Sequence, residues 1–323
     1  MILFLIEKIS FDFPGINLFS YLSFRAGCAI LTSLVIVLII GPKFIETMNS
    51  KQGKGQPIRV DGPKSHLFLK KGTPSMGGIL ILSSFFLSTL LWGDITNHLI
   101  WIVLLAGLLF GLIGYVDDRK KIKEQKSDGI SSKNKFLFQV LSSFVLIFLI
   151  TVFSSSELIY SVSIPFINGV FFLGIILYYC FTSFVIVGTS NAVNLTDGLD
   201  GLAIVPVMIA IASFGIITYL AGNLVYSEYL GINSIPYSGE LSILSCALLG
   251  SCLGFLWFNA PPAMIFMGDT GSLSLGAILA SIAVITKHEL VLIIIGGIFV
   301  LEAMSVIIQV FSYKVFGKRV FRM

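Results

Sequence analysis

Asn191-Ala-Val-Asn-Leu-Thr-Asp-Gly-Leu-Asp-Gly-Leu202 lies between two apolar runs, each long enough to cross a bilayer as a helix. Its polar side chains recur at every third residue, as Asn191, Asn194, Asp197 and Asp200. In a helix this spacing winds them into a slowly drifting stripe over one side. Two carboxylates with no Lys or Arg nearby are costly at a membrane edge unless a cation or a polar ligand neutralises them. The stretch therefore predicts a bound metal or polar substrate, with an ordinary solvated turn as the alternative.

The composition of the surrounding chain predicts an all-α, polytopic integral membrane protein. Of 323 residues, 56% are hydrophobic and 12% are charged, which is far more apolar than a soluble domain of this size. Apolar runs of about 20 residues recur along the whole length, and each can span the hydrocarbon as a helix. We expect a helical bundle of nine spans in a single domain, residues 1–323, with spans near 21–45, 77–93, 97–116, 135–154, 168–189, 199–221, 240–258, 270–286 and 289–313. The alternation of residues 162–170 around Asn168-Gly169 favours a hairpin between the fourth and fifth spans.

Basic residues are concentrated in alternate loops. The loop after the first span, the loop after the third span and the C-terminal tail are rich in Lys and Arg, whereas the loops on the other side contain almost none. Under the positive-inside rule, the odd-numbered spans then end in the cytoplasm. This alternation predicts that Asp117-Asp118, residues 191–202 and Asp269 share one cytoplasmic end of the bundle. Carboxylates at a membrane edge below basic loops suit a divalent metal and a polyanionic substrate.

Two motifs at this predicted end carry most of the chemistry. Asp117-Asp118 is either a carboxylate pair that binds metal or takes a proton, or only the boundary that stops membrane insertion. In residues 259–272, two prolines interrupt a helix and Gly-Asp-Thr-Gly-Ser opens the next one. Backbone amides at such a helix start suit phosphate, and Asp269 suits a metal that bridges phosphate oxygens. Phe266 is able to stack on a flat base, although an isolated Phe at this place more often faces lipid.

Other polar residues and some absent patterns narrow the function further. Lys70-Lys71, before a Gly/Pro turn, either clamps phosphate or anchors the span. Gln309 lies two turns after Glu302 on the last span, close enough to the cytoplasmic edge to reach a ligand. The four cysteines lie in apolar spans without paired spacing, which argues against zinc and disulfides. The sequence has no Walker loop, which argues against ATP-driven transport.

Five motifs together resemble a known family. They are Gly62-Pro-Lys-Ser-His66, Lys70-Lys-Gly-Thr-Pro-Ser-Met-Gly-Gly78, Val116-Asp-Asp118, the 191–202 stretch and Phe266-Met-Gly-Asp-Thr-Gly-Ser272. In this order they are similar to the bacterial phospho-N-acetylmuramoyl-pentapeptide transferases, which belong to the polyprenyl-phosphate N-acetylhexosamine-1-phosphate transferases. The resemblance runs from about the first span to the last residue. It implies a cytoplasmic (inner) membrane enzyme, with its active site on the cytoplasmic face, that uses Mg2+ to move phospho-MurNAc-pentapeptide from UDP to undecaprenyl phosphate, giving lipid I and UMP.

The resemblance also implies roles for individual residues. Asp117 would be the acid/base candidate at the lipid phosphate, with Asp118 beside it, and Asp269 would bind magnesium. Phe266 would stack on uracil. The remaining substrate-binding residues implied are Lys70, Lys121, Lys133, Asn191, Asn194, Asp197, Asp200, Asn259, Gly268, Ser272 and Gln309, of which Lys121 and Lys133 would lie near phosphates.

Two other functions stay open at this point. A sister enzyme that uses UDP-GlcNAc is the nearer alternative, and an ion-coupled transporter with intramembrane acids is the farther one. We expect the lipid bilayer and no nucleic acid as partners, and a homodimer is left open. The family has ten spans and continues, after the segment resembling Gly317–Met323, into a histidine-rich cytoplasmic loop. We therefore expect the 323-residue chain to insert in the membrane but to turn over poorly.

Overall fold

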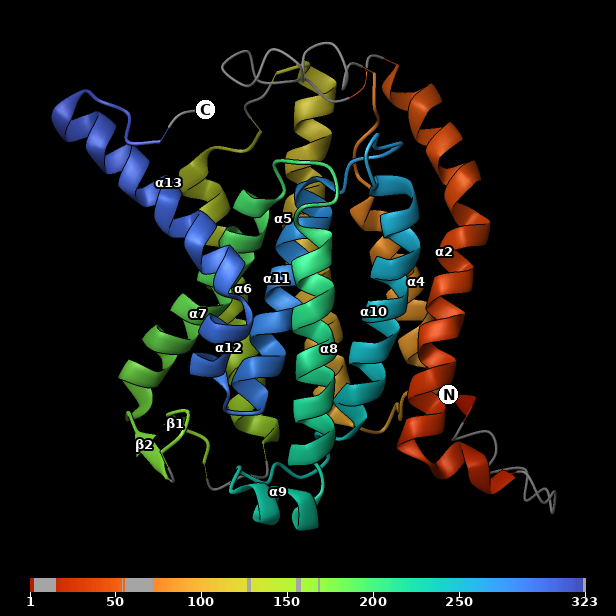
Figure 1. Ribbon diagram of the computed structural model, residues 1–323, viewed down its shortest axis with the longest axis vertical. Coiled ribbons are helices and arrows are strands. Elements are labelled where there is room, and N and C mark those ends of the chain that lie inside the picture. The colour runs from red at the N-terminus through yellow and green to blue at the C-terminus, as the bar shows by residue number, and fades with distance from the viewer. Residues whose placement is uncertain are drawn as a thin grey trace.

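The computed structural model describes residues 1–2, 16–53, 55, 72–126, 129–154, 158–167 and 169–321. Nine apolar helices of 15 residues or more make up most of the described chain (Figure 1). They are α2 (Leu22–Gln52), α4 (Gly78–Trp92), α5 (His98–Glu124), α6 (Ser132–Phe153), α7 (Ile175–Thr196), α8 (Ile204–Ala221), α10 (Glu240–Asn259), α11 (Gly268–Ile285) and α13 (Gly297–Phe316). The shorter elements are η1 (Ile16–Ser20), α9 (Leu224–Leu230), α12 (Glu289–Ile295), β1 (Ser161–Ser163) and β2 (Val170–Phe172). The predicted all-α, polytopic architecture is confirmed.

Eight of these helices are long and apolar enough to cross a membrane, and α4 is shorter, with 15 residues. A helix of that length spans about 22 Å, less than the hydrocarbon thickness of about 30 Å. Each of the first eight predicted spans corresponds to one of these helices, and the ninth corresponds to α12 and α13 together. The predicted boundaries are wrong by several residues in α5 and α7, because both helices continue past their apolar run through the polar residues of the site.

The ninth predicted span is not one helix. It is divided at Gly296 into α12 and α13, and α13 leans away from the bundle in Figure 1. Only Phe299 of α13 is buried, whereas side chains such as Leu301 and Phe311 are exposed. Exposed apolar side chains on a membrane helix face lipid, so α13 needs no protein partner to be stable there.

Helix α11 forms the centre of the bundle. In its most apolar 18-residue window, 94% of the residues are buried, compared with 6% in α13. Small residues allow this, because they let neighbouring backbones approach closely. A Cβ at Gly78 would lie 2.1 Å from the backbone nitrogen of Gly271, and a Cβ at Gly271 would lie 2.9 Å from Cα of Gly78 and 2.3 Å from the side chain of Met267. The start of α11 is therefore fixed by α4, which matters for the acidic residue that it carries.

The two ends of the bundle differ in character. At the lower end in Figure 1, β1 and β2 pair antiparallel, which confirms the hairpin, although Asn168 in its turn lies outside the described residues. At the same end, Arg25 of α2 binds Glu240 of α10 through both guanidinium nitrogens, at 2.5 and 2.9 Å. The upper end collects the last turns of α5 and α7 and the first turn of α11. The prediction that these three segments share one end is confirmed; that this end is cytoplasmic stays a prediction.

Candidate active site

Two carboxylates and two ammonium groups meet at the upper end of the bundle. Asp117 ends the membrane part of α5, Asp269 is the second residue of α11, Lys121 lies one turn after Asp117, and Lys135 lies in the first turn of α6. Lys121 Nζ is 2.7 Å from Asp117 Oδ2 and 3.0 Å from Asp269 Oδ2. Lys135 Nζ also contacts both carboxylates, at 3.5 Å from Asp117 and more closely at Asp269. Both lysines therefore bridge the same pair of acids, which we call the four-charge cluster.

The cluster is shielded but not closed. The side chain of Asp117 is 3% exposed, and its Oδ1 accepts a hydrogen bond of 2.7 Å from the backbone N–H of Ile130. The side chains of Asp269, Lys121 and Lys135 remain 15–17% exposed. Asn194 adds a neutral donor, with its amide nitrogen 3.1 Å from Asp269 Oδ1 and 2.7 Å from the hydroxyl of Ser272. Asp269 thus presents a partly solvated carboxylate, held from three sides, to any ligand that enters.

Asp118 has a different role from its neighbour. It is 2% exposed, and its carboxylate accepts hydrogen bonds from the backbone N–H of Asp269 (3.1 Å), the backbone N–H of Thr270 (2.9 Å) and the hydroxyl of Thr270 (2.7 Å). The first N–H groups of a helix have no partner within the helix, and a carboxylate stabilises them. Asp118 therefore anchors the start of α11 to α5 and fixes the place of Asp269.

This arrangement predicts that Asp118→Asn lowers stability as well as activity. An amide cannot accept at both positions, so hydrogen bonds to a charged group are lost and the free energy of unfolding should fall by about 2–3 kcal/mol. Thermal unfolding in detergent measures the change. Thr270→Val, which removes only the hydroxyl bond, serves as the control and should cost clearly less. Unchanged stability in Asp118→Asn would show that the anchor is not needed.

A short extended segment before α4 holds the loop that leads into α11. The backbone of Phe266 bonds to Pro74 O and accepts from Gly77 N–H, both at 2.9 Å, and Gly78 N–H donates to Met267 O at 2.8 Å. Gly268 follows with φ +74°, where a Cβ would lie 2.6 Å from Asp118 and 2.8 Å from Ser75. Glycine is required here by both the backbone angle and the space.

A second pair of segments frames the site beside this loop. Asn259 at the end of α10 is 3% exposed, accepts from Gly201 N–H at 3.0 Å and donates to Ile265 O at 2.9 Å. Asp200 accepts from Ala263 N–H at 3.4 Å. Asn259 therefore ties the turn after α7 to the 260–266 loop, and its side chain is already committed to the backbone.

The structure brings together some of the residues expected from the sequence and separates others. Asp117, Lys121, Asn194, Asp269 and Ser272 meet around the cluster. Asp197 ends α7 and is partly buried, as is Phe266. Lys70 lies outside the described residues.

Three other expected residues, Lys133, Asn191 and Gln309, make no hydrogen bond or ion pair with the four-charge cluster in the described chain. Lys133 of α6 is exposed, and no hydrogen bond or ion pair of its side chain is found within the described chain. Asn191 pairs with Gln139, with its amide nitrogen 2.9 Å from Gln139 Oε1. Gln309 of α13 accepts from the backbone N–H groups of Val320 and Phe321, each at 3.0 Å.

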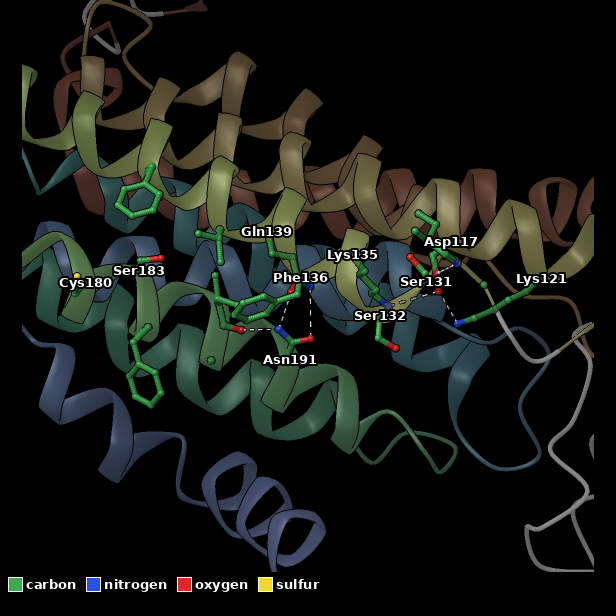
Figure 2. A pocket seen from close by; sticks show the side chains of 17 residues that line it. Asp117, Lys121, Ser131, Ser132, Lys135, Phe136, Gln139, Cys180, Ser183 and Asn191 are labelled. Carbon is green, nitrogen blue, oxygen red and sulfur yellow. Dashed lines mark hydrogen bonds and ion pairs between the residues drawn. The ribbon is translucent and has the colours of Figure 1, made fainter. Parts of the chain in front are cut away.

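A groove of about 1150 Å³ runs from the cluster toward the lipid-facing surface between α6 and α7 (Figure 2). Its polar end is formed by Asp117, Lys121 and Lys135, and its apolar end includes Phe144 and Phe184. Figure 2 shows Gln139 and Asn191 between these two ends, and dashed lines join them. The groove therefore changes from charged to apolar along its length.

Sequence reasoning missed Lys135, Gln139 and Ser75 as site residues. Lys135 and Gln139 are spaced by four residues on α6, so they share one face of a helix, and this spacing was available as a signal. Ser75 is 1% exposed beside Gly268, and its hydroxyl has no hydrogen-bond partner in the part of the chain that the structure describes. The position of Ser75 at the site follows only from the backbone contacts of the segment before α4, which the sequence does not show.

Comparison with known families matches this part of the chain. The model of glycosyl transferase family 4 covers residues 100–287, which include all but the first two residues of α5, the whole of α7, α10 and α11, and the four-charge cluster. The chain belongs to glycosyl transferase family 4. A second match, to phospho-N-acetylmuramoyl-pentapeptide-transferase signature 1, covers residues 70–82. The two matches confirm the resemblance to the polyprenyl-phosphate hexosamine-1-phosphate transferases, and the protein is a multi-pass membrane transferase.

Both matched regions contribute to the candidate site of this glycosyl transferase family 4 member. Residues 100–287 supply the charged groups, and the signature segment supplies the backbone groups that bond to Phe266 and Met267. The family uses a nucleotide-sugar donor and a polyprenyl phosphate acceptor. Both substrates carry phosphate, a group that lysine ammonium groups commonly bind.

The described residues contain no group of three His, Cys, Asp or Glu side chains that could hold a metal ion. Two carboxylates, Asp117 and Asp269, do converge on the same two ammonium groups, so cations are stable between them. Mg2+ is commonly held by one or two carboxylates, several waters and substrate phosphates. The residues present fit an ion of that kind, and Asp269 is the more accessible of the two acids.

Proposed function

We propose that this transferase moves phospho-MurNAc-pentapeptide from its UDP carrier to undecaprenyl phosphate, forming lipid I and releasing UMP for peptidoglycan synthesis. The observation that carries the proposal is the signature match over residues 70–82, in the segment that frames the loop before Asp269. We further propose that the upper end of the bundle faces the cytoplasm of a bacterium, because the described basic residues at the ends of α2, α5 and α13 lie there, among them Lys51, Lys123 and Lys314. That is the compartment that contains nucleotide-sugars.

The groove between α6 and α7 suits the acceptor. A polyprenyl phosphate has one dianionic head and a long apolar chain, and the groove has cations at one end and aromatic side chains at the other. With its phosphate at Lys121 and Lys135, the chain would lie along Phe144 and Phe184 toward the bilayer. Its head would then lie beside Asp117 and Asp269.

The donor would approach from the opposite side of the cluster. Asp197 and Asp200 lie in the turn after α7, and Phe266 lies in the 260–266 loop; Asn259 ties these two segments together. Asn194, which contacts Ser272, lies three residues before Asp197. We propose that this side holds the nucleotide, with Phe266 stacked on uracil. The sugar phosphate of the donor would then lie beside Asp269, next to the phosphate of the acceptor.

The reaction joins an acceptor phosphate oxygen to the phosphorus of the sugar phosphate and breaks the bond from that phosphorus to UMP. A phosphate monoester has a second pKa of about 6, so the acceptor is already largely dianionic near neutral pH. Asp117 is therefore needed less for proton removal than for holding Lys121 and Lys135 in place. The two lysines neutralise the phosphates and align them for transfer.

Mg2+ is the proposed cofactor, with Asp269 as its protein ligand and Asp117 nearby. When bound, it would neutralise charge on the donor diphosphate as the leaving group departs. Lys121 and Lys135, which contact Asp269 in the protein alone, would contact the substrate phosphates.

Measurement of UMP release tests the proposal directly. The purified protein in detergent, with Mg2+ and undecaprenyl phosphate, should release UMP with UDP-MurNAc-pentapeptide and much less with UDP-GlcNAc. The expected preference is at least about 10²-fold, because a site that pairs with a peptide stem leaves polar groups unsatisfied without it. Faster release with UDP-GlcNAc would favour the sister enzyme, and ion flux without UMP release would favour a transporter.

A further inference from the structure

The interface between α6 and α7 contains a row of three polar side-chain pairs, and three of these six side chains, Gln139, Asn191 and Ser183, line the groove. Gln139 pairs with Asn191, Ser143 pairs with Ser183 at 2.7 Å, and Thr151 pairs with Tyr179 at 3.3 Å. Polar pairs between membrane helices join them, although each contributes modestly to stability. The row begins directly below Lys135 and runs away from the site.

The first pair differs from the others in geometry. Gln139 is 1% exposed, and the two amides bond in both directions, with Asn191 Nδ2 2.9 Å from Gln139 Oε1 and Gln139 Nε2 3.4 Å from Asn191 Oδ1. Asn191 Nδ2 also bonds to Val187 O at 2.8 Å, which fixes its orientation on α7. A two-way amide pair restricts rotation of α6 about its axis, whereas a single hydroxyl contact restricts mainly the distance.

Lys135 depends on that rotation. It lies four residues before Gln139, so the two side chains share one face of α6. Its ammonium group contacts Asp117 of α5 and Asp269 of α11, so the side chain has to extend from α6 to two other helices. A small turn of α6 would move the end of this long side chain away from both acids.

We infer that Gln139 is a positioning residue, which acts through Asn191 to hold α6 in the rotation that points Lys135 at Asp117 and Asp269. The inference rests on the proposed function only for its catalytic consequence. The geometric part concerns Lys135 alone and is tested without turnover.

The geometric test measures the reactivity of Lys135 toward an amine acylating reagent, with Lys133 as the internal standard, in the whole protein in detergent. Peptide fragmentation in a mass spectrometer separates the two sites. In the wild type, Lys135 should react several-fold more slowly than the exposed Lys133. Gln139→Leu should raise the reactivity of Lys135 relative to Lys133, and Ser143→Ala, the matched control one turn further on, should leave the ratio unchanged.

The catalytic test follows UMP release in the same variants. Gln139→Leu should lower kcat by about 10-fold or more, since a displacement of about 1 Å at a reacting group can cost 10²-fold. The KM for the UDP-sugar should stay close to the wild-type value. The double variant Gln139→Asn/Asn191→Gln, which exchanges the two amides, should recover most of the lost kcat.

The outcomes separate the inference from the function. An unchanged Lys135 to Lys133 ratio in Gln139→Leu overturns the inference, whatever the activity. Equal effects of Gln139→Leu and Ser143→Ala on the ratio also overturn it, because they indicate general loosening of the α6–α7 interface. If Gln139→Leu does not fold, Gln139→Met replaces it with a side chain of similar length. A protein without UMP release but with the expected change in ratio would refute the proposed function and leave the positioning role supported.

Discussion

Asp269→Asn should abolish most of the transferase activity while the protein remains folded. The substitution keeps the shape of the side chain and its contact with Asn194, but it removes the charge that Lys121 and Lys135 share with Asp117. Loss of a group that stabilises charge in a transition state typically costs about 10²–10³-fold. UMP release at saturating substrates and at several Mg2+ concentrations measures the effect.

The matched control is Asp94→Asn. Asp94 accepts from Thr96 in the loop before α5, near Glu240 and therefore at the other end of the bundle. It should leave UMP release within about twofold of the wild type, as expected for a surface change far from the site. Near-normal activity of Asp269→Asn at ordinary Mg2+ concentrations would remove Asp269 from the proposed metal site.

The arrangement of the spans could be predicted because hydrophobicity and charge act over whole segments. Runs of about 20 apolar residues have few structural solutions in a bilayer, and alternation then fixes which ends meet. This is why Asp117, residues 191–202 and Asp269 could be assigned to one end from the sequence alone. The contacts of Asn194 with Asp269 and with Ser272 confirm this assignment.

The details that could not be predicted depend on individual hydrogen bonds. Asp117 and Asp118 are adjacent and chemically identical, yet one faces the lysines and the other anchors α11. Asn259 has a polar side chain of the kind that binds ligands, but its amide is hydrogen-bonded to two backbone groups. The break between α12 and α13 follows from Gly296, a residue that sequence patterns equally allow inside a membrane helix.

The two lysines of α6 give the sharpest expected contrast between neighbouring residues. Lys135→Met should lower UMP release by about 10²-fold or more, because it removes one of two cations at the acids and phosphates. Lys133→Met should change it by less than about threefold, since an exposed surface charge far from a ligand contributes little. The resemblance alone had indicated Lys133.

Helix geometry explains why only one of the two lysines is able to serve the site. Residues two apart on an α-helix are separated by a rotation of about 200° around its axis, so they lie on nearly opposite sides and Lys133 and Lys135 cannot both face α5 and α11. Lys135 contacts both acids, and Lys133 is exposed. A Lys133→Met/Lys135→Met double variant should therefore be no slower than Lys135→Met alone. A larger loss in Lys133→Met than in Lys135→Met would mean that α6 rotates by about half a turn when the substrates bind.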